Sequence, residues 1–252
     1  MRYRILDPTG NITALVEDEV PVDAQPSVAS EIMREHPEVE QVGFVRYTGT
    51  PELRMAGGEF CGNASMCAAA LYAETVMLDA QSVTLKVSGS AEPVVVRLSR
   101  TEEGDFECAV RMPVAVGVEK VAVSFDGLRD ELPIVRIPGI SHAIIESSSS
   151  FYALLTRPKD AERAVRVWCE ELGVDGLGLM FLEGEGQRRR CTPLVYVPGS
   201  GTVFWENSCA SGSAAVGMFL NESTLTLHEP GGVLRVECAP DGRVWLHGHV
   251  KM

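Results

Sequence analysis

Two short segments place a cysteine where it could exchange protons with a bound molecule. The segment "CGNAS" begins at Cys61 and "CASGS" begins at Cys209, and a glutamate, Glu59 or Glu206, stands just ahead of each. Each cysteine precedes a run of small apolar residues, which is typical of a helix buried on all sides. A cysteine at such a helix start lies beside unpaired backbone N–H groups, which bind anions and lower a thiol pKa. Two such thiols facing one carbon could take a proton from one face and deliver one to the other.

The remaining cysteines indicate packing rather than chemistry. The chain has seven cysteines with no CxxC pair, so the sequence predicts neither a disulfide framework nor a structural zinc site. His247 and His249 share one face of a strand without a third ligand nearby, so no metal is expected there. The cysteines interpreted as small buried hydrophobes are Cys67, Cys108, Cys169, Cys191 and Cys238.

The elements that must position Cys61 and Cys209 occur twice along the chain. A strand, a turn with proline and glycine, and a second strand open the sequence and recur at 132–146, which places Gly10 and Gly139 129 residues apart. A helix follows in each half, one beginning near Ser27 and one ending at Gly173. Next come a short apolar strand, the cysteine segment and further strands with turns.

This order predicts an internal duplication into two α+β halves, residues 1–115 and 116–252, with the last strand placed to return to the first half. Two like domains usually pack about a pseudo-twofold axis and leave a cleft between them. Cys61 and Cys209 would then face each other across that cleft, which would be the active site.

Composition excludes several classes of partner. The 252 residues carry a formal charge of −13, and 45% of them are hydrophobic, so a sizeable core is expected and binding to nucleic acid or anionic lipid is not. No signal-peptide pattern opens the chain, and no apolar run approaches the roughly 20 residues that span a bilayer. We expect a cytoplasmic protein with reduced thiols that binds a small molecule; a homodimer is compatible with the sequence.

The motifs resemble those of the diaminopimelate epimerase family, whose paired segments are Cys-Gly-Asn and Cys-Gly-Thr-Gly. "PTGN" at 8–11, "EQ" at 40–41 and "PGISH" at 138–142 are similar to further motifs of that family. The resemblance implies two domains, each a mixed barrel-like sheet around a central helix. It also implies a cofactor-independent amino-acid racemase or epimerase with Cys61 and Cys209 as its acid/base pair. The implied substrate-binding residues are Asn11, Gln41, Gly62, Asn63, Glu206, Ala210 and Ser211, with Glu206 near the substrate ammonium.

Departures from that family bear on the substrate. Met55, Ile140 and Asn207 stand where the family has polar residues that hold the distal end of diaminopimelate. Losing a guanidinium that pairs with a carboxylate is not a conservative change. We therefore expect a single-headed amino acid such as histidine. The spacing of the second motif looks more like that of the histidine racemases and phenazine-biosynthesis isomerases that share the fold.

Four other functions stay open from the sequence. The protein could be a diaminopimelate epimerase, or a phenazine-type isomerase, although Gln41 cannot transfer protons as the carboxylate of those isomerases does. It could be a hydrolase or transferase with Cys61 as nucleophile and His142 as base. It could also be a binding protein without catalysis. His142 itself fits either the cleft wall or a structural role.

Overall fold

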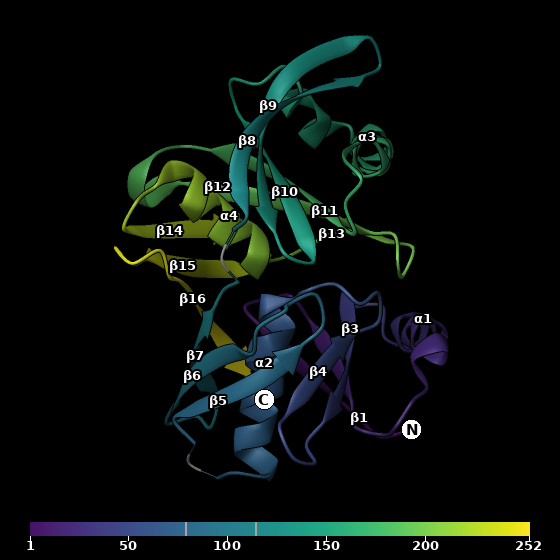
Figure 1. The fold of residues 1–252 in the computed structure, drawn as a ribbon, viewed down its shortest axis with the longest axis vertical. Coiled ribbons are helices and arrows are strands. Elements are labelled where there is room, and N and C mark those ends of the chain that lie inside the picture. Colours follow the sequence, from purple (N-terminus) through teal and green to yellow (C-terminus); the bar gives the residue numbers. More distant parts are fainter. Residues whose placement is uncertain (79, 114) are drawn as a thin grey trace.

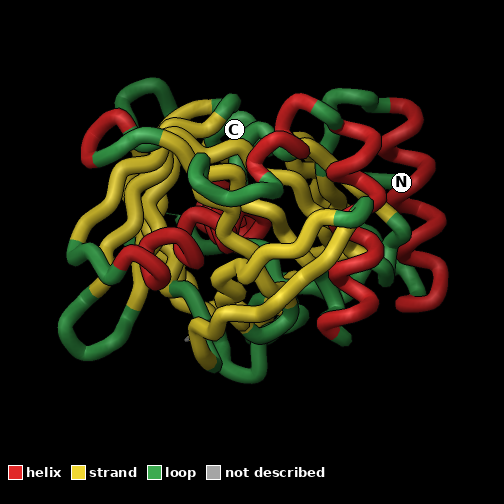
Figure 2. The backbone as a smooth tube through the Cα atoms, turned by 90° about the horizontal axis from the view of Figure 1, so that it is seen from above, coloured by secondary structure: helices red, strands yellow, loops and turns green. Residues whose placement is uncertain are grey.

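The computed structural model describes residues 1–78, 80–113 and 115–252 and shows an α+β protein (Figure 1). Apart from the strand Thr202–Trp205, its strands form one hydrogen-bonded path. Two helices, α2 (Gly62–Thr75) and α4 (Ala210–Leu220), are each enclosed by strands of their own half. Viewed from above in Figure 2, strands surround a central helix while other helices lie on the outside. No helix in the described residues is both long and apolar enough to cross a membrane.

The first half is a closed ring of eight strands around α2 (Gly62–Thr75). Its strands pair in the order β1 to β7, then β16, and β16 pairs with β1 to complete the ring. Small side chains let the strands close around α2, and its residues from 62 to 71 are all buried. The strands are β1 (Tyr3–Pro8), β2 (Thr13–Val16), β3 (Gln41–Arg46), β4 (Glu52–Met55), β5 (Ser82–Val87), β6 (Val94–Arg100), β7 (Phe106–Arg111) and β16 (Val244–Lys251).

The second half repeats this pairing around α4 (Ala210–Leu220). Hairpin β1–β2 corresponds to β9–β10, parallel pair β2–β3 to β10–β11, and parallel pair β4–β5 to β12–β14. The two halves share one hydrophobic core, because residues around α2 and around α4 belong to the same cluster. The strands are β8 (Gly117–Phe125), β9 (Leu128–Ile137), β10 (Ile140–Glu146), β11 (Leu177–Glu183), β12 (Arg190–Val197), β13 (Thr202–Trp205), β14 (Thr224–Glu229) and β15 (Gly232–Cys238).

An amphipathic helix covers the outside of each half. Helix α1 (Gln25–Glu35) begins two residues before Ser27, with Pro26 in its first turn, and packs Ala29 and Ile32 against β2 and β3. Helix α3 (Pro158–Leu172) packs on β11 and β12, with Trp168 buried beside Phe125 and Phe151. It ends at Gly173 in the left-handed conformation, as predicted. Short 3₁₀ helices lie at Val22–Ala24, Tyr152–Thr156 and Gly186–Arg188.

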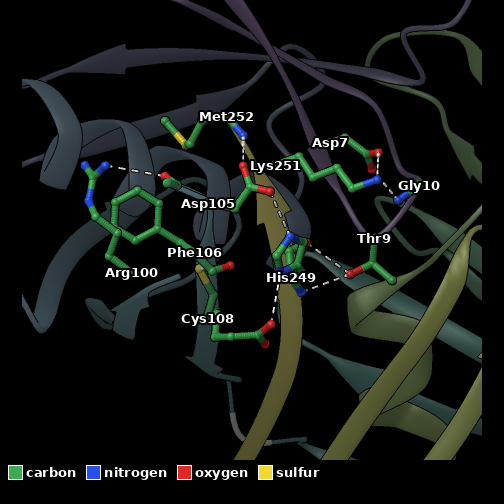
Figure 3. Close-up of polar contacts among 12 residues, drawn as sticks. Asp7, Thr9, Gly10, Arg100, Asp105, Phe106, Cys108, His249, Lys251 and Met252 are labelled. Carbon is green, nitrogen blue, oxygen red and sulfur yellow. Dashed lines mark hydrogen bonds and ion pairs between the residues drawn. The ribbon is translucent and has the colours of Figure 1, made fainter. Parts of the chain in front are cut away.

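Polar contacts hold the last strand, β16, against the first half (Figure 3). The His249 ring lies between two carboxylates, with Nε2 3.2 Å from Asp105 and Nδ1 2.9 Å from Glu107. Thr9 Oγ1 donates to the His249 carbonyl and accepts from its backbone N–H. Burial lowers the pKa of His249, but the two carboxylates together outweigh burial and raise this pKa above its usual value.

Turns of opposite halves touch through glycines. A Cβ on Gly139 would lie 2.7 Å from the Gly89 Cα, and a Cβ on Gly231 would lie 2.8 Å from the Gly10 Cα. Both contacts are backbone against backbone, so no side chain fits there. Each lies next to a cysteine segment: Gly139 also approaches Phe60, and Gly231 approaches Asn207.

Candidate active site

Both cysteines occupy the position immediately before a buried helix. Cys61 precedes α2 and Cys209 precedes α4, each in an extended backbone conformation. The helix starts touch, because a Cβ on Gly62 would lie only 2.8 Å from the Ala210 Cβ. The free N–H groups of both helices therefore converge where the two halves meet.

The two thiols line one small cavity between the halves. Its volume is about 30 Å³, room for two or three water molecules at most. The closed cavity is too small to hold an amino acid. The lining residues are Gln41, Glu59, Phe60, Cys61, Asn63, Ile140, Val195, Val197, Glu206, Cys209, Ala210 and Ser211.

Most of the residues implied by the resemblance lie on this wall, and two lie just behind it. Asn63 reaches across the halves and donates to the Ser208 carbonyl at 3.0 Å, which leaves its buried Oδ1 without a partner. Gly62 forms the contact between the helix starts, and Asn11 is buried behind Gln41.

Cys61 has neutral hydrogen-bond partners. Its thiol donates to Gln41 Oε1 at 2.9 Å and accepts from the Ala64 N–H at 3.4 Å. Burial, together with the charges of Glu206 and Glu59, raises the pKa of Cys61 to about 12, more than the Ala64 N–H and Gln41 lower it. The prediction that the helix start lowers this pKa is wrong for the closed cavity, because removal from water outweighs the N–H groups.

Cys209 has acidic neighbours. Its backbone N–H donates to Glu229 at 2.6 Å, and its thiol is hydrogen-bonded to Glu206. Burial raises the pKa of Cys209 well above its usual value, and the charges of Glu206 and Glu229 raise it further. Burial also raises the pKa of Glu206 and of Glu229 to about 8. Cys209 therefore also holds its proton in the closed cavity.

A hydrogen-bond network behind the cavity joins the halves. Gln41 donates to Asn11 and, at 2.7 Å, to Thr13 Oγ1. Asn11 donates to Glu40 at 2.7 Å, and Glu40 accepts from the Asn207 backbone at 3.1 Å. This network links β3 to the loop before α4, and so fixes one cysteine segment relative to the other.

The three residues that differ from those of the diaminopimelate epimerases lie in different surroundings. Ile140 lines the cavity. Asn207 is exposed and donates to Glu40, outside the cavity. The expectation for Met55 is wrong: its side chain is fully buried in the core, because β4 turns this residue inward toward α2.

His142 is not placed to act as a base for Cys61. It is fully buried on β10, neither ring nitrogen has a hydrogen-bond partner in the described part of the chain, and burial lowers its pKa to about 3. The thiol of Cys61 donates to Gln41 instead. These contacts do not support a hydrolase built on a Cys61–His142 pair. Among the described residues, no three His, Cys, Asp or Glu side chains gather closely enough to hold a metal ion.

Two acidic residues of the site were missed from sequence. Glu59 lines the cavity, and its position just before Cys61, like that of Glu206 before Cys209, was a usable signal. Glu229 lies on β14, twenty residues beyond Cys209, and no local pattern pointed to it.

Comparisons with known proteins agree with this geometry. A family model described as the histidine racemase CntK N-terminal domain matches residues 1–250. The chain belongs to this family. It is 30% identical over 223 residues to a histidine racemase of Fusobacterium nucleatum, covering 86% of this chain and 80% of that protein. It is 29% identical over 245 residues to a histidine racemase of Staphylococcus aureus, covering 91% and 85%.

Solved structures share the family's fold. A protein described as a predicted epimerase from Pseudomonas aeruginosa has a TM-score of 0.67 at 16% identity, covering 99% of this chain and 96% of that chain. A hydroxyproline epimerase from Agrobacterium vitis with bound trans-4-OH-L-proline has a TM-score of 0.65 at 13% identity, covering 100% and 90%. A phenazine biosynthesis PhzF family protein from Enterococcus faecalis has a TM-score of 0.62 at 16% identity, covering 99% and 95%. These likenesses concern the fold; membership of the histidine racemase family makes the protein an isomerase of the racemase/epimerase class.

Proposed function

We propose that the protein is a cofactor-independent racemase that inverts the α-carbon of histidine by proton transfer between Cys61 and Cys209. The observation that carries this proposal is that both thiols stand at touching helix starts and line one cavity. Cys67, Cys108, Cys169, Cys191 and Cys238 are absent from that cavity wall.

The N–H groups at the starts of α2 and α4 hold the substrate carboxylate, and Glu206 pairs with its ammonium. One cysteine, as thiolate, takes the α-proton and becomes a thiol. The other thiol gives its proton to the opposite face and becomes a thiolate, so the two residues exchange roles and no proton is lost. Negative charge that develops on the carboxylate is stabilised by the same N–H groups.

Formation of the thiolate requires a change in the closed cavity, since burial keeps both thiols protonated there. A substrate ammonium in the cavity favours a nearby thiolate by charge attraction. Cys61 forms the thiolate first, because Cys209 is hydrogen-bonded to Glu206 and lies near Glu229. The form with Cys61 as thiolate takes the α-proton of the enantiomer whose hydrogen faces Cys61, with Cys209 as the acid. For the other enantiomer the two roles are reversed.

The charges of the cavity support a single-headed substrate with a hydrogen-bond donor in its side chain. Two carboxyl groups, Glu59 and Glu206, line it, and no lysine, arginine or histidine of the described residues does. A second substrate carboxylate, like that of diaminopimelate, would face these acids unpaired. Histidine has one carboxylate and a side-chain N–H, and it is the amino acid in the names of the relatives.

In this proposal, residues 1–115 and 116–252 are two domains related by a pseudo-twofold axis. The two domains separate to admit the substrate. The repeated strand pairing and the glycine contacts between turns of opposite halves support this role. Because both thiols must stay reduced, the proposal also places the protein in the cytoplasm.

The test is racemisation by the purified protein without added cofactor. Each chiral proteinogenic L-amino acid and diaminopimelate is incubated separately, and chiral chromatography measures the inverted product, with and without EDTA and hydroxylamine. We expect D-histidine as the fastest product, unaffected by either reagent. Cys61→Ser and Cys209→Ser should each lose activity by orders of magnitude, whereas Cys238→Ser, on β15 away from the cavity, should not. Fastest inversion of diaminopimelate, or an active Cys209→Ser variant, would contradict the proposal.

A further inference from the structure

The backbone of Glu59 is held firmly beside Cys61. Ser88 Oγ donates to the Glu59 carbonyl at 2.8 Å. The turns at Gly89 and Gly139, one from each half, contact the backbone of the next residue, Phe60. A Cβ on Gly139 would lie 3.0 Å from the Phe60 backbone nitrogen. These contacts fix the position of the Glu59 backbone, from which the carboxylate extends, relative to Cys61.

One oxygen of this carboxylate has no hydrogen-bond donor. The side chain folds over Gly57, whose added Cβ would lie 2.7 Å from Oε2, and the backbone N–H groups of Gly57 and Glu59 donate to the carboxylate. Oε2 is nevertheless buried without a partner. Burial raises the pKa of Glu59, more than the two backbone N–H groups and the Arg54 charge lower it. The Arg54 guanidinium lies against Gly58 on the other side of the loop. A buried carboxylate oxygen without a donor is costly, so Glu59 is prepared to accept a hydrogen bond.

The neighbouring acids are already engaged. Both oxygens of Glu40 accept hydrogen bonds, from Asn11 and from Asn207, and Glu206 is hydrogen-bonded to Cys209. Within the described part of the chain, Glu59 is the acid of the cavity with a buried oxygen that lacks a partner.

Glu59 lies where a substrate side chain would extend, because it lines two adjoining cavities. A second cavity of about 40 Å³ adjoins the first and shares Gln41, Glu59, Val195, Val197 and Glu206 with it. It continues away from the thiols toward Thr202 and Phe204. With the α-carbon between the thiols and the ammonium at Glu206, the side chain extends past Glu59 into this second cavity.

We propose that Glu59 selects the substrate side chain, by accepting a hydrogen bond at its carboxylate from an N–H group of the imidazole ring. This proposal rests on the racemase function proposed above. Glu59 then discriminates against amino acids of similar shape whose side chains lack a donor, because such a side chain would bury the carboxylate without supplying that hydrogen bond.

The experiment compares L-histidine with 3-(2-thienyl)-L-alanine, whose five-membered ring has no N–H. The wild-type protein should have a kcat/KM for histidine about 100-fold or more above that for thienylalanine. Glu59→Met keeps the volume but removes charge and acceptor, and should lower kcat/KM for histidine by about 10- to 100-fold, chiefly through KM. The value for thienylalanine should stay level or rise. Glu59→Gln keeps one acceptor oxygen, so its kcat/KM for histidine should lie between the values of the wild type and of Glu59→Met.

Two controls separate selection from general damage. Glu103→Met, at an exposed position in the turn before β7, should change neither substrate. Glu59→Met should unfold at the same or a higher temperature than wild type, because a buried carboxylate is replaced by an apolar side chain.

The outcomes distinguish this proposal from the function on which it rests. Equal loss for both substrates in Glu59→Met, or no loss for histidine, would overturn the role of Glu59 while racemisation by the wild type stands. If the wild type racemises neither amino acid, the proposed function fails. Calorimetry then measures the affinity of each protein for histidine and for thienylalanine. If the wild type binds histidine more tightly and Glu59→Met removes this difference, the selection by Glu59 is supported. Equal affinities of the wild type for the two ligands refute it.

Discussion

Replacing Gly62 by alanine tests whether the contact between the two helix starts sets the positions of the thiols. The new Cβ would lie 2.8 Å from the Ala210 Cβ, 0.6 Å short of an ordinary 3.4 Å contact. Helices α2 and α4 must therefore move apart at the residues that follow Cys61 and Cys209. Overpacking of this kind costs about 1–3 kcal/mol of unfolding free energy, or about 2–4 °C of Tm per kcal/mol. Misplacement of this order should also lower kcat/KM by about 10- to 100-fold.

Removing the other methyl group should restore the fit. In Gly62→Ala/Ala210→Gly the helix starts again meet through one methyl group, so urea unfolding and histidine racemisation should return to the level of Ala210→Gly alone. Gly117→Ala is the matched control, because its added Cβ would meet nothing within 4 Å. Unchanged kcat/KM in Gly62→Ala, or a double variant no better than Gly62→Ala, would refute the reasoning.

Three further predictions concern thiols and pH. In the native protein, iodoacetamide should modify Cys61 before Cys209, since Cys61 is partly exposed and Cys209 is buried beside Glu206 and Glu229; peptide mass spectrometry showing the reverse order would count against the proposed base. Mild oxidation should join Cys61 to Cys209 and abolish racemisation until a thiol reductant is added; two free thiols in oxidised, inactive protein would show that they do not face each other. The contribution of His249 to stability should be complete below its ordinary pKa of about 6.5 and disappear as pH rises through its higher folded pKa. At about pH 5.5, wild type and His249→Gln should differ in urea unfolding free energy by at most about 1 kcal/mol, because this group is partly exposed. The difference should shrink as the pH rises to about 8.5. A difference that grows with pH would contradict this account of His249.

The local elements around the cysteines could be predicted from sequence because their signals are local. Small residues after Cys61 and Cys209 indicated buried helices, and both helices begin where expected. Gly173 marked the end of α3 through its freedom to adopt the left-handed conformation. The start of α1 was placed too late at Ser27, because Pro26 fits the first turn of a helix and Ser27 is not needed as a cap.

The electrostatic character of the site could not be predicted, because it depends on burial. A helix start lowers the pKa of an exposed thiol, but enclosure of Cys61 by residues of both halves reverses the sign. Glu229 acts on Cys209 through a contact between distant parts of the chain. Met55 was assigned to the site by its place in the sequence, yet the alternation of β4 turns it into the core. These three features follow from packing between segments that no short pattern describes.

The origin of the hydrogen on the inverted carbon tests the two-cysteine mechanism most directly. The wild-type protein is incubated with L-histidine in D₂O, and separately with D-histidine, and both enantiomers are separated at early conversion for mass spectrometry. Because one residue removes the proton and another delivers a solvent-equilibrated one, the product should carry deuterium at Cα while the remaining substrate keeps its hydrogen, in both directions. Product that retains the original hydrogen, or substrate that gains deuterium as fast as product forms, would contradict proton transfer between Cys61 and Cys209.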